Sequence, residues 1–210
     1  VPFNAVIDPA DLQVTITPNS NLTELRTGQV TISANVFQDG GGNQVALTNS
    51  SFLVADVTLP VVDSAFISTD NSYIYFYFSE AVFSQGNGAG ILLAEDFEIN
   101  FTTSANTTSA TITSLTQTNG NSLAGGETAV RLYLSYDNPP GGTEVMTIRP
   151  ATNQVYDSFG NAMNANANPQ TFNLSDILVP SVTFDPENGS SNLYPDGAIT
   201  ITFSESIRYA

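Results

Sequence analysis

The sequence contains no cysteine, no histidine, no lysine and no tryptophan among its 210 residues. Without cysteine, the chain has no disulfide, no thiolate nucleophile and no cysteine-ligated zinc. Without histidine, it lacks the commonest general base and the usual catalytic triad. Together these absences predict a protein that is not an enzyme. A cysteine-free composition also suits large exported repeat proteins, which are translocated unfolded and must avoid mispairing.

Positive charge is scarce as well. The basic residues are Arg26, Arg131, Arg149 and Arg208, against 20 acidic residues, and the formal net charge is −16. Such a surface repels phosphate backbones and anionic headgroups, so we expect neither a nucleic-acid partner nor attraction to anionic membranes. The acidic excess favours hard cations, above all Ca²⁺, although it is explained equally well as a means of staying soluble.

Long apolar runs are also missing, and we expect no membrane insertion because no run of about 18 apolar residues exists. Val1 is not preceded by Met or a charged segment, so any signal peptide is expected to be already removed. What the chain does contain is 41% hydrophobic residues, among which Val, Ile, Phe and Tyr are prominent, together with many Thr residues, 15 Gly and 11 Pro. This composition is typical of a folded β-protein with many turns.

Residue patterns recur at an interval of about 120 residues, which is the signature of an internal repeat. The D-x-x-G-N sequence at Asp39 returns at Asp157, an offset of 118 (157 − 39). Further matches pair Leu12, Val14 and Ile16 with Val130, Leu132 and Leu134; Asp56 and Pro60 with Asp176 and Pro180; and the F-S-E of Phe78 with that of Phe203. The small drift in offset fits insertions in surface loops.

The repeat predicts three parts. Residues 60–179 form one complete repeat, residues 1–59 the C-terminal part of a preceding one, and residues 180–210 the N-terminal strands of a following one. Within the complete repeat, β-rich stretches are expected at 66–68, 73–78, 97–101, 110–115, 129–135, 145–149 and 170–174, with one helical turn at 94–97. About seven short strands separated by turn clusters indicate an antiparallel sandwich.

Two segments carry a family resemblance. Residues 178–189 (LVPSVTFDPENG) and 196–205 (DGAITITFSE) resemble the opening of the bacterial immunoglobulin-like (Ig-like) repeats of S-layer proteins and large adhesins. Residues 144–161 (EVMTIRPATNQVYDSFGN) resemble the closing half of such repeats in exported proteins of the Bacteroidetes type. The resemblance implies an all-β fold of antiparallel Ig-like β-sandwich repeats in tandem. It also implies an extracellular or cell-surface location and a role as spacer, stalk or adhesive fibre rather than as enzyme.

Acidic residues gather at the predicted repeat boundaries, where they close one repeat, open the next or end its second strand. They are Asp56, Asp63, Glu80, Asp176, Asp185 and Glu205. If they converge at the joint between repeats, carboxylates and carbonyls together would form a Ca²⁺ site that stiffens the stalk. The alternative is that they are solvated strand ends, with the glutamate of F-S-E accepting a hydrogen bond from a linker amide.

The aspartates of the two D-x-x-G-N turns, Asp39 and Asp157, allow two interpretations. A short Asp side chain caps its own turn by accepting backbone N–H bonds, while glycine supplies the positive φ. The other interpretation is a Ca²⁺ ligand, although the turn has too few acids for an EF-hand loop.

The densest acidic cluster is Glu95, Asp96 and Glu98. Paired carboxylates suggest glycoside hydrolysis. Strand alternation would place Asp96 and Glu98 on one face, but we expect neither a buried acid nor an aromatic platform beside them. The sequence therefore predicts no catalytic residues.

An aromatic ladder stands out in the stretch 73–78, where Tyr73, Tyr75 and Tyr77 alternate with apolar residues that belong to the core. Exposed tyrosines are enriched at interfaces, so the row is expected to contact a neighbouring subunit or a surface glycan, or simply to pack across strands. In the following repeat the inward positions are Ile199, Ile201 and Phe203, which we include among the interface residues.

Three functions remain open from the sequence. The chain is a non-catalytic structural segment of a cell-surface adhesin or filament, surrounded by neighbouring repeats of the same protein. Alternatively, it is a filament subunit whose broken end domains, 1–59 and 180–210, complete each other by strand exchange between subunits. The third reading is a carbohydrate-binding module, which the tyrosine row alone supports.

Overall fold

A computed structural model describes residues 1–8, 13–166, 169–191, 194 and 196–208. Apart from one 3-10 turn, the regular elements of these residues are β-strands, and every strand pair is antiparallel. No helix in this part of the chain is long and apolar enough to cross a bilayer. The chain divides into two compact units, Val1–Leu59 and Pro60–Ala210. Leu12, one of the repeat positions, lies outside the described residues.

The first unit contains two separate strand pairs. β1 (Phe3–Asp8) pairs with β2 (Gln13–Pro18), and β3 (Thr27–Ile32) pairs with β4 (Thr48–Leu53). Large apolar side chains remain exposed here; Phe3 is 57% exposed and Phe52 42%. Both residues line an open cleft of about 460 Å³, together with Ile16 and Val30. The strands of this unit therefore form without enclosing a core of their own.

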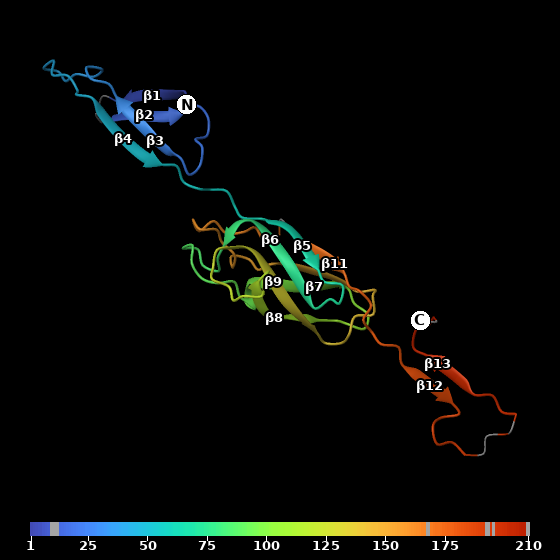
Figure 1. The fold of residues 1–210 in the computed structure, drawn as a ribbon. Coiled ribbons are helices and arrows are strands. Elements are labelled where there is room, and N and C mark those ends of the chain that lie inside the picture. The colour runs from blue at the N-terminus through green and yellow to red at the C-terminus, as the bar shows by residue number, and fades with distance from the viewer. Residues whose placement is uncertain (9–12, 167–168, 192–193, 195, 209–210) are drawn as a thin grey trace. The chain divides into compact units, whose positions relative to one another are not determined.

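The second unit contains a two-layered sandwich built from seven strands, which we call the central sandwich (Figure 1). One sheet has the order β5-β6-β9-β8 and the other β11-β10-β7. The bounds are β5 Val62–Ile67, β6 Tyr73–Val82, β7 Phe97–Thr103, β8 Ala110–Gln117, β9 Glu127–Tyr136, β10 Val145–Pro150 and β11 Gln170–Asn173. Counted in chain order within the central sandwich, from β5 as the first to β11 as the seventh, the first sheet has the strand order 1-2-5-4. The second sheet has the order 7-6-3. This is the strand order of a constant-type immunoglobulin domain, so the fold is the expected antiparallel Ig-like β-sandwich.

The core of this sandwich lies between its two sheets, because alternate residues of each strand point inward. Ile74 and Phe76 of β6 are fully buried, and the ring of Phe76 lies 5.7 Å from that of Phe97, in an edge-on arrangement. The remaining fully buried apolar side chains on the central strands are Val82, Val130, Leu132, Met146 and Ile148. Burying each such side chain stabilises the fold by roughly 1.5–3 kcal/mol.

Each of the seven β-rich stretches overlaps one strand, but every strand has an end that differs from expectation, and the two largest differences are the start of β5 and the end of β6. β5 begins at Val62 rather than at residue 66, because Val62 pairs with Phe78 and packs into the core. β6 continues beyond Glu80 to Val82, which pairs with Glu127 after a shift in register. The expectation that Glu80 ends its strand was therefore wrong. A buried valine two residues further on extends the pairing.

The second unit also contains a hairpin of β12 (Val182–Asp185) and β13 (Thr200–Phe203). Val182 lies opposite Phe203 and Phe184 opposite Ile201, so the four apolar side chains share one face. All of them are exposed: Phe184 is 48% exposed, Ile201 51% and Phe203 38%. The corresponding face of β5–β6 in the central sandwich is buried.

Candidate functional site

The outward surface of the sheet β5-β6-β9-β8 is rich in aromatic side chains. Its register places Phe66 beside Tyr75, Tyr75 beside Arg131, and Tyr73 beside Tyr133. The rings of Tyr73 and Tyr75 lie 5.1 Å apart, and those of Phe66 and Tyr77 6.1 Å apart. We call this surface the aromatic face; it comprises Phe66, Tyr73, Tyr75, Tyr77, Arg131 and Tyr133.

Arg131 lies at the centre of the aromatic face. Its guanidinium carbon is 5.1 Å from the ring centre of Tyr73, 4.9 Å from that of Tyr75 and 5.7 Å from that of Tyr133. Nη1 donates to the Tyr133 hydroxyl at 2.8 Å, and Nη2 donates to the Tyr75 hydroxyl at 2.6 Å and to the carbonyl of Thr118. Hydrogen bonding to Tyr133 raises the pKa of Arg131, so the cation is retained. These cation–π contacts fix three rings in one arrangement.

The predicted alternation of β6 is confirmed. Ile74 and Phe76 are fully buried, whereas Tyr77 is 37% exposed and Tyr73 and Tyr75 are half-buried. Beside the rings, a shallow depression of about 470 Å³ is lined by Phe66, Ser68, Asp70, Tyr73 and Tyr75. Flat aromatic surfaces next to polar groups suit the apolar faces and hydroxyls of sugars. Binding by the tyrosine row stays a prediction.

Asp70 supplies the charged group at this depression. The hydroxyl of Ser72 donates to its Oδ1 at 2.7 Å, and the Ser72 amide at 3.1 Å. Hydrogen bonds from the hydroxyls of Ser68 and Ser72 lower the pKa of Asp70 to about 2. Its carboxylate is therefore ionised at neutral pH and offers two strong acceptor atoms.

The sequence did not single out Arg131, Phe66 or Tyr133 as site residues. The signal for Arg131 was present, because it sits between Val130 and Leu132 in a stretch whose apolar residues were expected inward. Its position beside Tyr75 depends on which strands are neighbours and on the register in which they pair. Sequence periodicity predicts neither the strand order nor the register.

The acids of the predicted Ca²⁺ set are distributed along the chain, and within the second unit two of them come close together. Carboxylate oxygens of Glu80 and Asp157 lie within 4.8 Å of each other. Asp157 is fully buried; its Oδ1 accepts the amides of Phe159 and Asn161 at 2.8 and 2.9 Å, and its Oδ2 accepts Nδ2 of Asn161 at 2.7 Å. Two carboxylates fall well short of the six to eight oxygens that Ca²⁺ takes.

The other D-x-x-G-N turn repeats this geometry. Oδ1 of Asp39 accepts the amides of Gly41 and Asn43 at 2.9 and 2.8 Å, and its Oδ2 accepts Nδ2 of Asn43 at 2.8 Å. Gly42 has φ +83° and Gly160 φ +91°, a conformation that favours glycine. The capping role predicted for Asp39 and Asp157 is therefore confirmed, while Ca²⁺ ligation stays a prediction.

The boundary aspartates also act as local caps. Oδ1 of Asp56 accepts the amide of Thr58 at 3.1 Å, and Oδ1 of Asp176 accepts the amide of Leu178 at 3.0 Å. Asp63 is exposed on β5 and Asp185 on β12. Glu205 is half-buried, and its Oε1 accepts no hydrogen bond from the described residues. Among the described residues of the second unit, Asp63, Asp176, Asp185 and Glu205 do not join Glu80 and Asp157 in one cluster.

In both F-S-E motifs the serine binds the linker amide, a role that the sequence had suggested for the glutamate. Oγ of Ser79 accepts the amide of Val61 at 3.0 Å, and the Ser79 amide donates to the Val61 carbonyl at 3.0 Å. Oγ of Ser204 accepts the amide of Ser181 at 2.9 Å, and the Ser204 amide donates to the Ser181 carbonyl at 3.0 Å. Each linker is thus held at the start of its hairpin by the same pair of bonds.

The cluster at residues 95–98 differs from expectation in one respect. Asp96 is only 3% exposed, although we expected no buried acid there. A 3-10 turn at Ala94–Asp96 breaks the strand alternation and turns Asp96 inward. Its Oδ2 accepts the amide of Leu93 at 2.7 Å, and burial raises its pKa.

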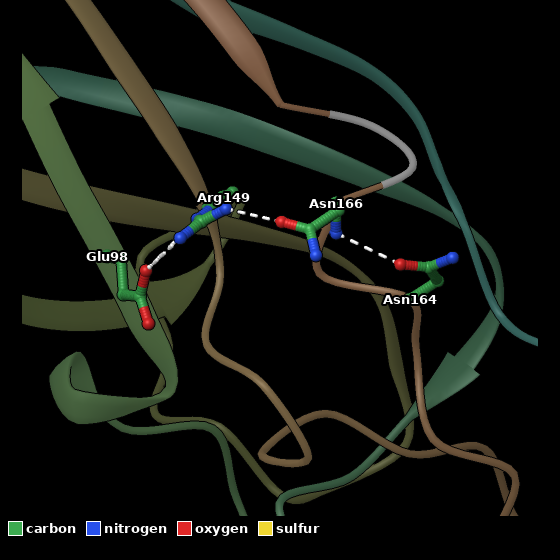
Figure 2. A network of polar contacts seen from close by, with 4 residues as sticks. All are labelled: Glu98, Arg149, Asn164 and Asn166. Atoms are coloured by element: carbon green, nitrogen blue, oxygen red, sulfur yellow. Dashed lines mark hydrogen bonds and ion pairs between the residues drawn. The ribbon is translucent and has the colours of Figure 1, made fainter.

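Glu98 belongs to a separate polar network (Figure 2). Its Oε2 accepts Nε and Nη2 of Arg149 at 3.0 and 2.7 Å, an ion pair across the neighbouring strands β7 and β10. Nη1 of Arg149 donates to Oδ1 of Asn166 at 2.5 Å, and the Asn166 amide donates to Oδ1 of Asn164 at 3.0 Å. The hydrogen bond from Arg149 to Asn166 therefore ties the sheet to the loop before β11.

The chain matches no family model, no curated protein and no solved structure. The candidate site consequently depends on the geometry described above.

Proposed function

We propose that this chain is a non-catalytic structural repeat segment of an extracellular adhesin or filament, in which it builds a stalk or fibre. Neighbouring repeats of the same protein are its principal partners. The cysteine-free composition suits such an exported protein, because a chain that is translocated unfolded then has no thiols to mispair.

The observation that carries the proposal is the recurrence of the linker hydrogen bonds. The amide before β5 binds Ser79 and the amide before β12 binds Ser204, in the same two-bond pattern. Two further hydrogen-bonded features recur in the same order along the chain. They are the capped D-x-x-G-N loops and the turns capped by the boundary aspartates Asp56 and Asp176. A chain that holds successive linkers in the same way suits a stack of similar modules.

The proposal is tested on intact cells of the source organism. Antibodies raised against the whole chain should label the outside of unpermeabilised cells, and immunogold electron microscopy should place the label on stalks, fibres or a surface layer. Labelling that appears only after permeabilisation would overturn the extracellular assignment.

A second candidate function is carbohydrate binding, which the aromatic face favours. Three tyrosine rings held by Arg131 beside the ionised Asp70 combine stacking surfaces with hydrogen-bonding groups. The triple variant Tyr73→Thr, Tyr75→Thr and Tyr77→Thr should keep its circular dichroism spectrum and lose binding on an array of surface glycans. Tyr156→Thr is the control, because the Tyr156 hydroxyl donates to the Asn153 carbonyl in another loop. Absence of glycan binding by the wild-type chain would exclude this candidate.

A further inference from the structure

We propose that the depression beside Phe66, Asp70 and Tyr73 is a binding subsite for a neutral pyranose sugar. The sugar places an apolar C–H face against the aromatic rings and donates a hydroxyl hydrogen to the carboxylate of Asp70. The inference rests on the carbohydrate-binding candidate of the proposed function, for which it names the place of binding, the class of sugar and the residue that selects it.

The depression combines apolar walls with hydrogen-bonding groups. Its volume of about 470 Å³ is within the range of small-molecule sites. Phe66, which is 59% exposed, lines it together with the rings of Tyr73 and Tyr75. Ser68 and Thr69 also line it and contribute hydroxyl groups. This combination matches a sugar ring, which is apolar on its C–H face and polar at its edge.

The turn that carries Asp70 is held in place by buried hydrogen bonds. Asn71 is fully buried; its Nδ2 donates to the carbonyl of Ser175 at 2.7 Å, and its Oδ1 accepts the Ser175 amide at 2.9 Å. The hydroxyl of Tyr136 donates to the Asn71 carbonyl at 3.0 Å. The Asn71 amide closes the turn by donating to the carbonyl of Ser68 at 3.0 Å. Because the turn is already ordered, little conformational entropy is lost when a ligand binds.

Arg131 fixes the rings and at the same time disfavours a cationic ligand. Its guanidinium carbon lies 5.1 Å from the ring centre of Tyr73 and 4.9 Å from that of Tyr75, and its Nη2 donates to the Tyr75 hydroxyl. The attraction of these two rings for a cation is thus already satisfied, and the guanidinium repels a second positive charge nearby. A protonated amino sugar is therefore a poor match for this site.

Asp70 disfavours ligands of the opposite charge. Hydrogen bonds from the hydroxyls of Ser68 and Ser72 lower the pKa of Asp70 to about 2, so its carboxylate is ionised at neutral pH. An ionised carboxylate repels the acid group of a uronic acid, and the net charge of −16 adds to this repulsion. It accepts a neutral hydroxyl instead, because a carboxylate has about four acceptor positions and the serines leave room for a ligand. The charges around the depression therefore select a neutral sugar.

The test measures binding of the full chain to immobilised polysaccharides by biolayer interferometry. Dextran, mannan and galactan are the neutral probes, and polygalacturonate is the acidic one. Galactan and polygalacturonate form a matched pair, because both consist of galactose-type rings and only the second carries carboxylates. The buffer contains about 0.5 M salt, which screens long-range repulsion between polyanions, so that the difference reports the site itself.

We expect the chain to bind at least one neutral probe, and to bind polygalacturonate at least about tenfold more weakly, because like charges meet at Asp70. Asp70→Asn removes the charge and keeps one acceptor oxygen. It should weaken binding to the neutral probe by about tenfold, as for a lost charge-assisted hydrogen bond, and narrow the preference over polygalacturonate. A merely structural role of Asp70 would not change that preference.

Two further variants locate the sugar. Phe66→Ala removes an exposed ring from the wall of the depression and should weaken binding by about tenfold, as for a lost stacking contact. Asp63→Asn is the matched control for Asp70→Asn, because Asp63 is an exposed acid of β5 outside the depression. It should leave the affinity unchanged. Each variant should keep the circular dichroism spectrum of the wild type.

The subsite is overturned if the chain binds no neutral probe, if it prefers polygalacturonate, or if Asp70→Asn and Phe66→Ala bind as the wild type does. Glycan binding that depends on the tyrosine row but not on Asp70 or Phe66 would leave the carbohydrate-binding candidate standing. Absence of all glycan binding would remove that candidate as well. Surface labelling of intact cells would in either case still support the structural segment.

Discussion

At the scale of single residues, the acidic side chains of this protein serve mainly as acceptors for backbone amides. Asp157 is the most buried of the loop acids and satisfies two amides and the Asn161 side chain. These acceptors lie in a loop that packs against the sandwich. The carboxylate thereby replaces regular strand pairing in a turn that has little of it.

Asp157→Ala should lower the free energy of unfolding by about 2 kcal/mol, since buried donors lose their acceptor. Urea unfolding followed by tyrosine fluorescence measures this, because residues 1–59 contain no tyrosine and the signal reports the second unit. Ser158→Ala in the same loop is the control and should leave the midpoint unchanged. Equal effects of the two substitutions would argue against the capping role.

Glu144 is a second buried acceptor, only 1% exposed. Its Oε1 accepts the amides of Asn106 and Thr107 at 3.0 and 3.2 Å, and its Oε2 accepts those of Gly141 and Thr143 at 3.0 and 3.1 Å. Burial alone would raise the pKa of Glu144. The backbone N–H bonds, led by that of Gly141, outweigh it and lower the pKa below 4.5.

Because the pKa of Glu144 is lowered on folding, its ionised form contributes stability that is fully present above pH 4.5, the unfolded value. That contribution is lost as the pH falls toward and through the folded pKa. Glu144→Gln places an NH₂ group against amide donors, so it should destabilise the protein at pH 7. The difference from wild type should shrink in urea titrations below pH 4. A difference that is constant with pH would show that Glu144 is not charged in the fold.

At the scale of elements, seven β-rich stretches and the 3-10 turn were predictable, because alternating apolar residues and turn clusters are local signals. The ends of the strands were harder to predict from the sequence. Val62 and Val82 belong to strands because partners distant in sequence, Phe78 and Glu127, lie opposite them. The binding of the linker amide by Ser79 could not be predicted either. The F-S-E motif alone does not show whether its serine or its glutamate faces the linker.

Removing the hydroxyl of Ser79 should loosen the linker without unfolding the sandwich. In Ser79→Ala the Val61 amide loses its acceptor, while the reverse bond from the residue-79 amide to the Val61 carbonyl remains. We expect amide hydrogen exchange at Val61 to accelerate by about tenfold, which corresponds to one hydrogen bond of ~1.4 kcal/mol. Ser204→Ala is a matched variant that should accelerate exchange at Ser181 and not at Val61. Unchanged exchange at Val61 would mean that the hydroxyl does not hold the linker.

At the scale of the whole molecule, the open question from the sequence is Ca²⁺. If Glu80 and Asp157 contribute to a site of the affinity common in extracellular modules, 10 mM Ca²⁺ should raise Tm by about 5 °C relative to EDTA. The Glu80→Gln variant should lose most of that increase, and Mg²⁺ should not replace Ca²⁺. Identical melting curves in Ca²⁺ and EDTA would show that the protein binds no stabilising Ca²⁺.

The sequence by itself determined the fold class and the faces of the strands. Composition and period-two alternation are enough to make β-structure and to separate Ile74 and Phe76 from the tyrosines, because both depend on local geometry. It also offered the capped loop as one of two interpretations of the D-x-x-G-N turns, since Asp and Gly act there on their own neighbours in sequence.

Only the tertiary structure decided which side chains meet. Arg131 lies among three tyrosines because β9 is the neighbour of β6 in one particular register, and that choice depends on burying both sheets at once. The same non-local requirement explains why Ile74 is buried while Ile199, in a similar pattern, is 63% exposed. Whether an apolar strand face becomes core depends on what lies opposite it, which local sequence does not specify.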